Sequence, residues 1–282
     1  MAHKKSDDEK IFLEKIHYHI QKNTLSGIKI RECFPKNEKM YISTMKSGGK
    51  RKDHYDFKLT FPDGTLKNVE FKGSQKFKPI DDNKPPWHYG VQFYNGAGNN
   101  FSIGQKYARH VYDTGIDTII EGLQITTPKP NYEEWAKDAF REAKPKTPFV
   151  CEIRNKGYCG SYLSNLRLNI NRNFTSNTYD MMVLMDEVQT IANDVFEQKD
   201  YWLQIHGNID DPETFHVKWT PKMSMPQIIT VEETKSKSNC DIMFRFICDD
   251  GFVFYAQMRW GYGQLITNIR IDLKTFNKYR IV

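Results

Sequence analysis

The sequence has few cysteines, and their arrangement excludes the two structures that cysteines most often build. The 282 residues include five cysteines, an odd number, and these are scattered without a CxxC pair. The pattern predicts neither a disulfide framework nor a zinc site, so reduced thiols are expected. The sequence also lacks a Gly-x-Ser-x-Gly motif and a catalytic-cysteine signature, which leaves little support for an enzyme with a serine or cysteine nucleophile.

Long apolar runs are missing as well. No stretch approaches the roughly 18 consecutive apolar residues of a membrane span, and residues 1–10 contain no apolar signal core. We therefore expect a protein that is not secreted, has no membrane partner and works in an intracellular reducing compartment, the cytoplasm or the nucleus. Apolar residues still make up 39% of the chain and aromatic residues 13%, enough for one large or two modest domains.

The strongest local pattern is a β-hairpin whose turn is the Pro-Asp-Gly sequence of residues 62–64. Pro followed by Gly suits a type I turn closed by a bulge, and apolar and polar positions alternate on both sides of it. The register that this turn imposes places Asp56 directly opposite Glu70, with Lys72 on the same face. The other face suits a core and collects Phe57, Leu59, Phe61, Val69 and Phe71.

Two carboxylates and a lysine on one side of an anchored hairpin suit a divalent metal ion with a cation beside it. Oxygen ligands bind hard cations such as Mg²⁺, and phosphodiester hydrolysis needs an activated water and positive charge near the phosphate. The alternative is an exposed face with ordinary solvated charges. The spacing alone does not decide, because Asp8/Lys10 and Glu197/Lys199 repeat it by chance, but only Glu70/Lys72 has an aspartate opposite.

Tyr55-Asp56 and Glu70-Phe71-Lys72 together resemble the PD-(D/E)xK nuclease superfamily, although Tyr replaces the Pro of the family motif. The resemblance implies an α/β fold with a restriction-endonuclease-like αβββαβ core. It also implies that Asp56 and Glu70 are metal ligands, that the Phe71 carbonyl is a further ligand, and that Lys72 positions the attacking water. The implied cofactor is Mg²⁺, for which Mn²⁺ could substitute.

Glu9 is a candidate fourth member of the metal site. A helix is expected over residues 7–23, and Glu9 has helical spacing with the apolar residues Leu13, Ile16 and Ile20. Members of the superfamily often add a carboxylate from the first helix. An interaction with the helix dipole is an equally good explanation of this acidic residue.

Two basic segments are candidate nucleic-acid contacts. Lys50, Arg51 and Lys52 precede the Asp56 strand and could bind phosphates without reading sequence, although a plain mobile loop is an equal alternative. Arg259 stands among aromatic residues and glycines, and arginine can read guanine edges, but an ordinary aromatic hairpin explains it at least as well. The net charge of +6 is a modest basic excess that solvated lysines alone could produce.

The expected organisation is a nuclease core at residues 1–127, a linker with a short helix at 128–148, and a strand-rich α+β C-terminal domain at 149–282. Helices are expected at 103–114, 132–143 and 178–199. Beyond the hairpin, strands are expected at 27–32, 39–44, 89–95, 117–126, 201–206, 214–220, 241–248, 252–260 and 264–273.

These observations predict a Mg²⁺-dependent endonuclease that hydrolyses phosphodiester bonds. DNA is favoured over RNA, and a C-terminal region that selects the sequence, as in restriction-like enzymes, is an analogy at the level of the fold. The expected partner is nucleic acid, double-stranded DNA first, with a homodimer as a further option. The alternative is a catalytically inactive nucleic-acid-binding or structural protein that retains a nuclease-like core.

Overall fold

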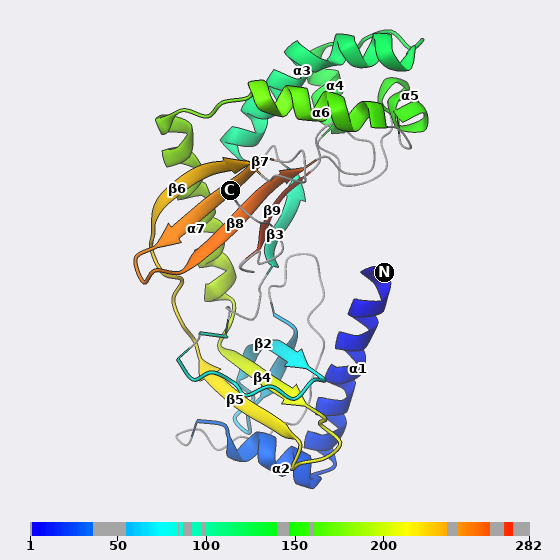
Figure 1. Cartoon of the computed structure of the whole chain (residues 1–282). Helices are drawn as coiled ribbons and strands as arrows, with labels where there is room; N and C mark the ends of the chain where they lie inside the picture. The colour runs from blue at the N-terminus through cyan, green and yellow to red at the C-terminus, as the bar shows by residue number, and fades with distance from the viewer. Residues whose placement is uncertain are drawn as a thin grey trace. The chain divides into compact units, whose positions relative to one another are not determined.

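The computed structural model describes residues 2–35, 55–83, 85–86, 92–97, 100–139, 147–157, 161–235, 242–259 and 268–272. Within these ranges, side chains are described except at residues 2–9, 92–97, 139, 157, 161–164, 235, 259 and 268–272. The chain divides into two compact units (Figure 1). Unit 1 comprises Met1–Tyr89 and Ala192–Met225, and unit 2 comprises Gly90–Ile191 and Pro226–Val282. The expected division differs, because residues 192–225 join the N-terminal segment instead of a C-terminal domain.

Unit 1 is built on a four-stranded sheet with the strand order β1-β2-β4-β5. The strands are β1 (Phe57–Thr60), β2 (Leu66–Ser74), β4 (Tyr201–Gly207) and β5 (Phe215–Pro221). Strands β1 and β2 form an antiparallel hairpin, β2 and β4 pair in parallel, and β4 and β5 pair antiparallel. Since β2 and β4 are far apart in sequence, a long insertion separates two neighbouring strands of this sheet.

Helices α1 (Ala2–Gln21) and α2 (Leu25–Glu32) pack on one face of this sheet through a shared hydrophobic core. Helix α1 contributes a stripe spaced by four residues, as an amphipathic helix does. The core residues from the helices and the sheet include Phe12, Ile16, Ile20, Ile30, Phe57, Leu59, Val69, Phe71, Leu203, Ile205 and Trp219. The apolar face predicted for the hairpin is thus confirmed, with Phe61 partly buried at its edge.

The strand expected at residues 27–32 is wrong, because these residues belong to helix α2. Thr24 caps the helix, and its side chain accepts a hydrogen bond from the Gly27 amide at 3.2 Å. A Cβ atom at Gly27 would lie 2.1 Å from the His19 carbonyl oxygen, so the two helices touch backbone to backbone here. Ile28 and Ile30 alternate as apolar residues do in a strand. The Thr24 cap and the close contact with helix α1 favour the helix instead.

The opposite face of the sheet is covered at one end by the last turn of helix α7 (Thr178–Glu197). The ring centroids of Phe196 and Trp202 lie 5.6 Å apart, and both side chains are buried. Unit 1 therefore has helical residues on both faces of a mixed sheet. The helix predicted at residues 178–199 is confirmed.

In unit 2, the helices α3 (Ser102–Leu123), α4 (Tyr132–Ala139), α5 (Pro148–Gly157) and α6 (Ser161–Asn173) form an α-helical layer (Figure 1). The strand expected at residues 117–126 is wrong, because helix α3 continues to Leu123. Its glycine at position 115 does not end the helix but lets Ile170 of α6 approach closely, since a Cβ there would lie 2.3 Å from the Ile170 side chain. Helices α5 and α6 were not predicted.

Unit 2 also contains a five-stranded antiparallel sheet with the order β3-β9-β8-β7-β6. Its strands are β3 (Gln92–Ala97), β6 (Ile228–Lys235), β7 (Ile242–Cys248), β8 (Val253–Arg259) and β9 (Asn268–Asp272). All except β6 overlap predicted strands. The protein is a mixed α/β structure with two sheets, and none of the helices in its described part combines the length and apolarity that a membrane span requires.

Candidate functional site

The β1–β2 hairpin has the register that the sequence predicts. The Phe61 amide donates to the Thr65 carbonyl at 2.9 Å, and Gly64 has the positive φ of 83° that the turn needs. Phe57 pairs with Val69. The paired register ends there, and Asp56 directly precedes β1, beside the Val69-Glu70 part of β2.

Asp56 is tied to strand β2 by two hydrogen bonds, one on each side of Glu70. Its backbone amide donates to the Val69 carbonyl at 2.9 Å, and its Oδ2 accepts from the Phe71 amide at 2.6 Å. The Asp56 carboxylate is therefore anchored to the strand that carries Glu70, and an amide donor stabilises its charged form.

Glu70 is the centre of a buried charge cluster. Its Oε1 lies 2.5 Å from Lys72 Nζ, and its Oε2 lies 2.7 Å from Lys199 Nζ. The side chains of Glu70 and Lys72 are 10% and 16% exposed, and that of Lys199 is 1% exposed. Both oxygens of this carboxylate are thus engaged by ammonium groups in a site that is almost closed to water.

Lys199 reaches Glu70 because the connection between α7 and β4 is tied to β2. The Asn68 amide donates to Asp200 Oδ2 at 2.8 Å, the Asp200 amide donates to the Asn68 carbonyl at 2.9 Å, and the Asn68 side chain donates to the Gln198 carbonyl at 2.9 Å. The Lys199 ammonium also lies 5.5 Å from the ring centroid of Trp202, within cation–π range.

Sequence reasoning missed Lys199, which it treated as half of a chance match with Glu197. No local sequence pattern indicates that Lys199 belongs to the site. A lysine between a helix and a buried strand is unremarkable until the parallel β2–β4 pairing is known.

The cluster changes the proton affinities of its members. Burial raises the pKa of the Glu70 carboxyl, but the adjacent Lys72 and Lys199 ammonium groups outweigh it and hold that pKa below its usual value. Burial lowers the pKa of Lys199, only partly opposed by Glu70. Glu70 is therefore an ionised carboxylate at neutral pH.

The polar face continues across the sheet in register. Lys72 on β2, Gln204 on β4 and Lys218 on β5 form one row, and Ser74, His206 and His216 form the next. Gln204 and His206 are both buried.

The segment after β2, residues 75–83, contacts these rows. The Lys78 carbonyl lies 3.3 Å from His206 Nδ1, the Phe77 ring lies 4.7 Å from the His216 ring, and Asp82 pairs with Lys218 at 2.9 Å. Burial lowers the pKa of His206, so this imidazole is neutral at pH 7.

The oxygen donors of the cluster suit a hard divalent cation. Asp56 and Glu70 supply two carboxylates, and the Phe71 peptide is held between them by its bond to Asp56. A cation would have to replace a lysine at one Glu70 oxygen, which the two-lysine arrangement permits without leaving that carboxylate unpaired. In the described ranges, no group of three or more His, Cys, Asp or Glu side chains could hold a metal ion.

The other predicted site residues are not brought into this cluster by the described structure. The backbone of Glu9 belongs to helix α1, but its side chain lies outside the described residues, as do Lys50, Arg51 and Lys52. Arg259 ends strand β8 in unit 2, where it pairs with Asn268, and its side chain is not described.

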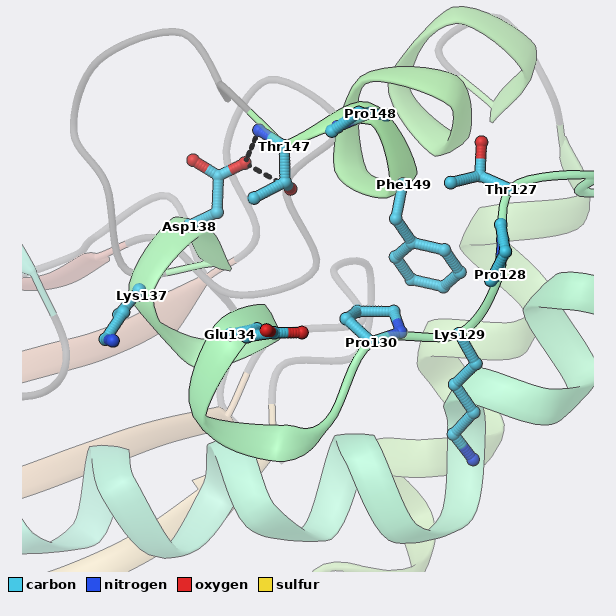
Figure 2. Close-up of a pocket in the computed structure, with 10 residues that line it drawn as sticks. All are labelled: Thr127, Pro128, Lys129, Pro130, Glu134, Lys137, Asp138, Thr147, Pro148 and Phe149. Atoms are coloured by element: carbon cyan, nitrogen blue, oxygen red, sulfur yellow. Dashed lines mark hydrogen bonds between the residues drawn. The ribbon is translucent and has the colours of Figure 1, made fainter.

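A separate pocket of about 560 Å³ lies in unit 2 around helices α4 and α5. Figure 2 shows the Phe149 ring facing Pro128 and Pro130 across this pocket. Asp138 at its edge accepts from the Thr147 amide and hydroxyl at 2.9 and 2.8 Å, which fixes the start of α5. The pocket contains none of the predicted site residues.

Comparison with known proteins gives no relative from which the role of this site could be inferred. No protein-family model, curated protein or solved structure matches the chain.

Proposed function

We propose that this protein is a metal-dependent endonuclease whose active site is the Asp56–Glu70–Lys72 cluster of unit 1. The observation that supports this proposal is the attachment of Asp56 to β2, through hydrogen bonds with the Val69 carbonyl and the Phe71 amide, on either side of Glu70, which contacts Lys72 at 2.5 Å. The cluster is buried, charged and anchored by backbone hydrogen bonds, as a preorganised catalytic site requires.

The topology of unit 1 supports the family resemblance. A hairpin is followed by helix α7 and by strand β4, which pairs in parallel with β2, and helical residues lie on both faces of the sheet. This order is that of the ββαβ part of a restriction-endonuclease-like core, with unit 2 residues inserted between β2 and α7. The strand expected at residues 39–44, which would be the first of the core, lies outside the described residues.

We propose Mg²⁺ as the cofactor, with Mn²⁺ as a substitute. Asp56, Glu70 and the Phe71 carbonyl would hold it, and Glu9 is a further candidate ligand. When bound, such an ion makes a coordinated water more acidic and neutralises phosphate charge. Lys72 would place its ammonium beside that water and beside the charge that develops on the phosphate. Lys199 would keep the second Glu70 oxygen neutralised.

We propose double-stranded DNA as the substrate, in an intracellular reducing compartment, with a homodimer as an assembly that remains to be tested. Neutralising Lys50, Arg51 and Lys52 should weaken binding to all DNA sequences equally and lower the salt slope by about one unit per lost phosphate contact. Arg259→Ala should reduce affinity for a preferred site by about 1–3 kcal/mol and affect random DNA little. Equal losses on every sequence would instead indicate a non-specific nuclease.

The experiment is cleavage of plasmid DNA and of RNA by the full chain in Mg²⁺, Mn²⁺, Ca²⁺ or EDTA. Asp56→Asn and Glu70→Gln keep hydrogen-bonding oxygens and should abolish Mg²⁺-dependent cleavage, and Lys72→Ala should lose cleavage but still bind DNA in Ca²⁺. Lys67→Ala is the matched control, because Lys67 lies on the same strand in a half-exposed ion pair with Asp200. Wild-type turnover in Asp56→Asn or Glu70→Gln would remove that residue from the site.

One observation favours a second candidate, an inactive protein with a nuclease-like core. Both Glu70 oxygens already have lysine partners, and such a trio could serve the fold alone. In that case adding a divalent metal would shift the melting temperature of the wild type no more than that of Glu70→Gln. The nuclease proposal requires the opposite, because a ligand that binds only the folded state stabilises it.

A further inference from the structure

Gln204 is a buried carboxamide without a hydrogen-bond partner among the described residues. Its side chain lies on β4 with 0% exposure, and neither Oε1 nor Nε2 is paired with any residue that the structure describes. An unpaired buried amide destabilises a folded protein, whereas a Leu or Met of similar volume would not. A group of this kind inside a charged cluster indicates a partner that is present only during function.

The register shows which groups surround Gln204. Lys72 is its neighbour on β2 and Lys218 its neighbour on β5, and side chains in one row project from the same face of a sheet whose strands lie about 4.8 Å apart. Lys218 is paired with Asp82. Lys72 is paired with Glu70, the residue that would have to exchange a lysine for a metal ion.

The chemistry of the two neighbours is complementary. An ammonium group only donates hydrogen bonds, and a carboxamide oxygen only accepts them. If a cation takes the Glu70 Oε1 position, the Lys72 ammonium loses this acceptor inside a site where its side chain is only 16% exposed. Gln204 Oε1 is an unpaired acceptor on the adjacent strand.

We propose that Gln204 is a positioning residue for Lys72, whose ammonium it accepts at Oε1 when a divalent cation occupies Glu70. The inference rests on the proposed function, since it requires a cation at that carboxylate. It explains why a polar side chain is kept in a buried position without a partner. The Gln204 Nε2 group, which only donates, is left to face an anionic oxygen such as that of a phosphate.

The first test compares Gln204→Met with Thr220→Val. Thr220 lies on β5 opposite Trp202, and its Oγ1 is also buried and unpaired with the residues described, so both changes remove a buried polar group without a partner. Gln204→Met should melt no lower than the wild type, keep its KM for DNA within about twofold and lose turnover by about 10–100-fold, as for residues that orient metal-site groups. Thr220→Val should keep wild-type turnover.

The second test does not depend on cleavage. The side-chain amide resonance of Gln204, assigned through its connection to the Gln204 backbone resonances, is followed by NMR while Ca²⁺ is added to the full chain. The resonance should shift in the wild type and stay unchanged in Glu70→Gln. If the Gln204 resonance shifts with Ca²⁺ but the wild-type protein does not cleave nucleic acid, the nuclease function is refuted and the Gln204 inference stands.

Two results would overturn the inference. The first is a folded Gln204→Met variant with wild-type turnover. The second is a Gln204 resonance that does not shift when Ca²⁺ is added. This measurement uses the wild type, so it tests the inference even if Gln204→Met fails to fold.

Discussion

Replacing Lys199 with Met tests the charge cluster most directly. The change removes a charge-assisted hydrogen bond of 2.7 Å to Glu70, worth about 1.5–3 kcal/mol, and a cation–π contact with Trp202, worth about 0.5–2 kcal/mol. The cost of burying the ammonium disappears at the same time and offsets part of this loss. Glu70 also keeps Lys72, so the loss should stay below the about 3–5 kcal/mol of a fully broken buried pair.

We therefore expect Lys199→Met to destabilise the protein by about 1–3 kcal/mol. Thermal unfolding followed by circular dichroism should show a melting temperature lower by about 5 °C. In a Glu70→Gln background the same change should cost at least about 1 kcal/mol less, which a double-mutant cycle measures. The matched control is Lys67→Met, whose partner Asp200 is 3.7 Å away in a half-exposed pair, and it should cost less than about 1 kcal/mol.

The same variant tests the link between the cluster and the metal. Removing Lys199 leaves one Glu70 oxygen without a competing cation, so Mg²⁺ should raise the melting temperature of Lys199→Met more than that of the wild type. A variant as stable as the wild type, or one whose loss is unchanged in the Glu70→Gln background, would refute the described ion pair.

Three further predictions concern stability. Gly27→Ala should lower the free energy of unfolding by more than about 2 kcal/mol, because its Cβ would lie 2.1 Å from the His19 carbonyl oxygen. Gly64→Ala, in open space at φ 83°, should lower it by only about 1–2 kcal/mol, and urea unfolding measures both. The pKa of His206 is lowered below 6.5 in the folded state, so stability should fall as the pH drops below 6.5, and His206→Gln should remove that part of the slope in a pH titration of stability. The pKa of Glu70 is lowered below 4.5, so its contribution should be complete above that pH and disappear on further acidification, a loss that Glu70→Gln abolishes in the same titration.

The hairpin could be predicted because its causes are local. A Pro-Asp-Gly turn sets the register, and the alternation of Phe57, Leu59, Val69 and Phe71 sets which face is buried. The pairing of Phe57 with Val69, which brings Asp56 close to the strand that carries Glu70, follows from these two facts. The helix over residues 178–199 was predictable for a similar reason, since its apolar face repeats along the chain.

Other parts of the fold depend on contacts that one sequence does not show. Residues 27–32 alternate like a strand, and only the close approach of Gly27 to helix α1 explains why they form a helix. Lys199 and Gln204 join the candidate site through the parallel pairing of β2 with β4. Their roles could not be read from spacing, because Glu70 and Lys72, the residues of β2 that they face, are more than a hundred positions away.

The parallel pairing of β2 with β4 also determines when the site can form. Glu70 and Lys199 are separated by 129 positions, and closing a loop of that length costs about 4 kcal/mol of chain entropy beyond a constant. During synthesis, a ribosome must therefore make the segment between them, and then α7 and β4, before the cluster can assemble. A chain that ends after Lys72 but before β4 carries Asp56, Glu70 and Lys72 but lacks the buried surroundings that hold them together, so such incomplete products should be inert.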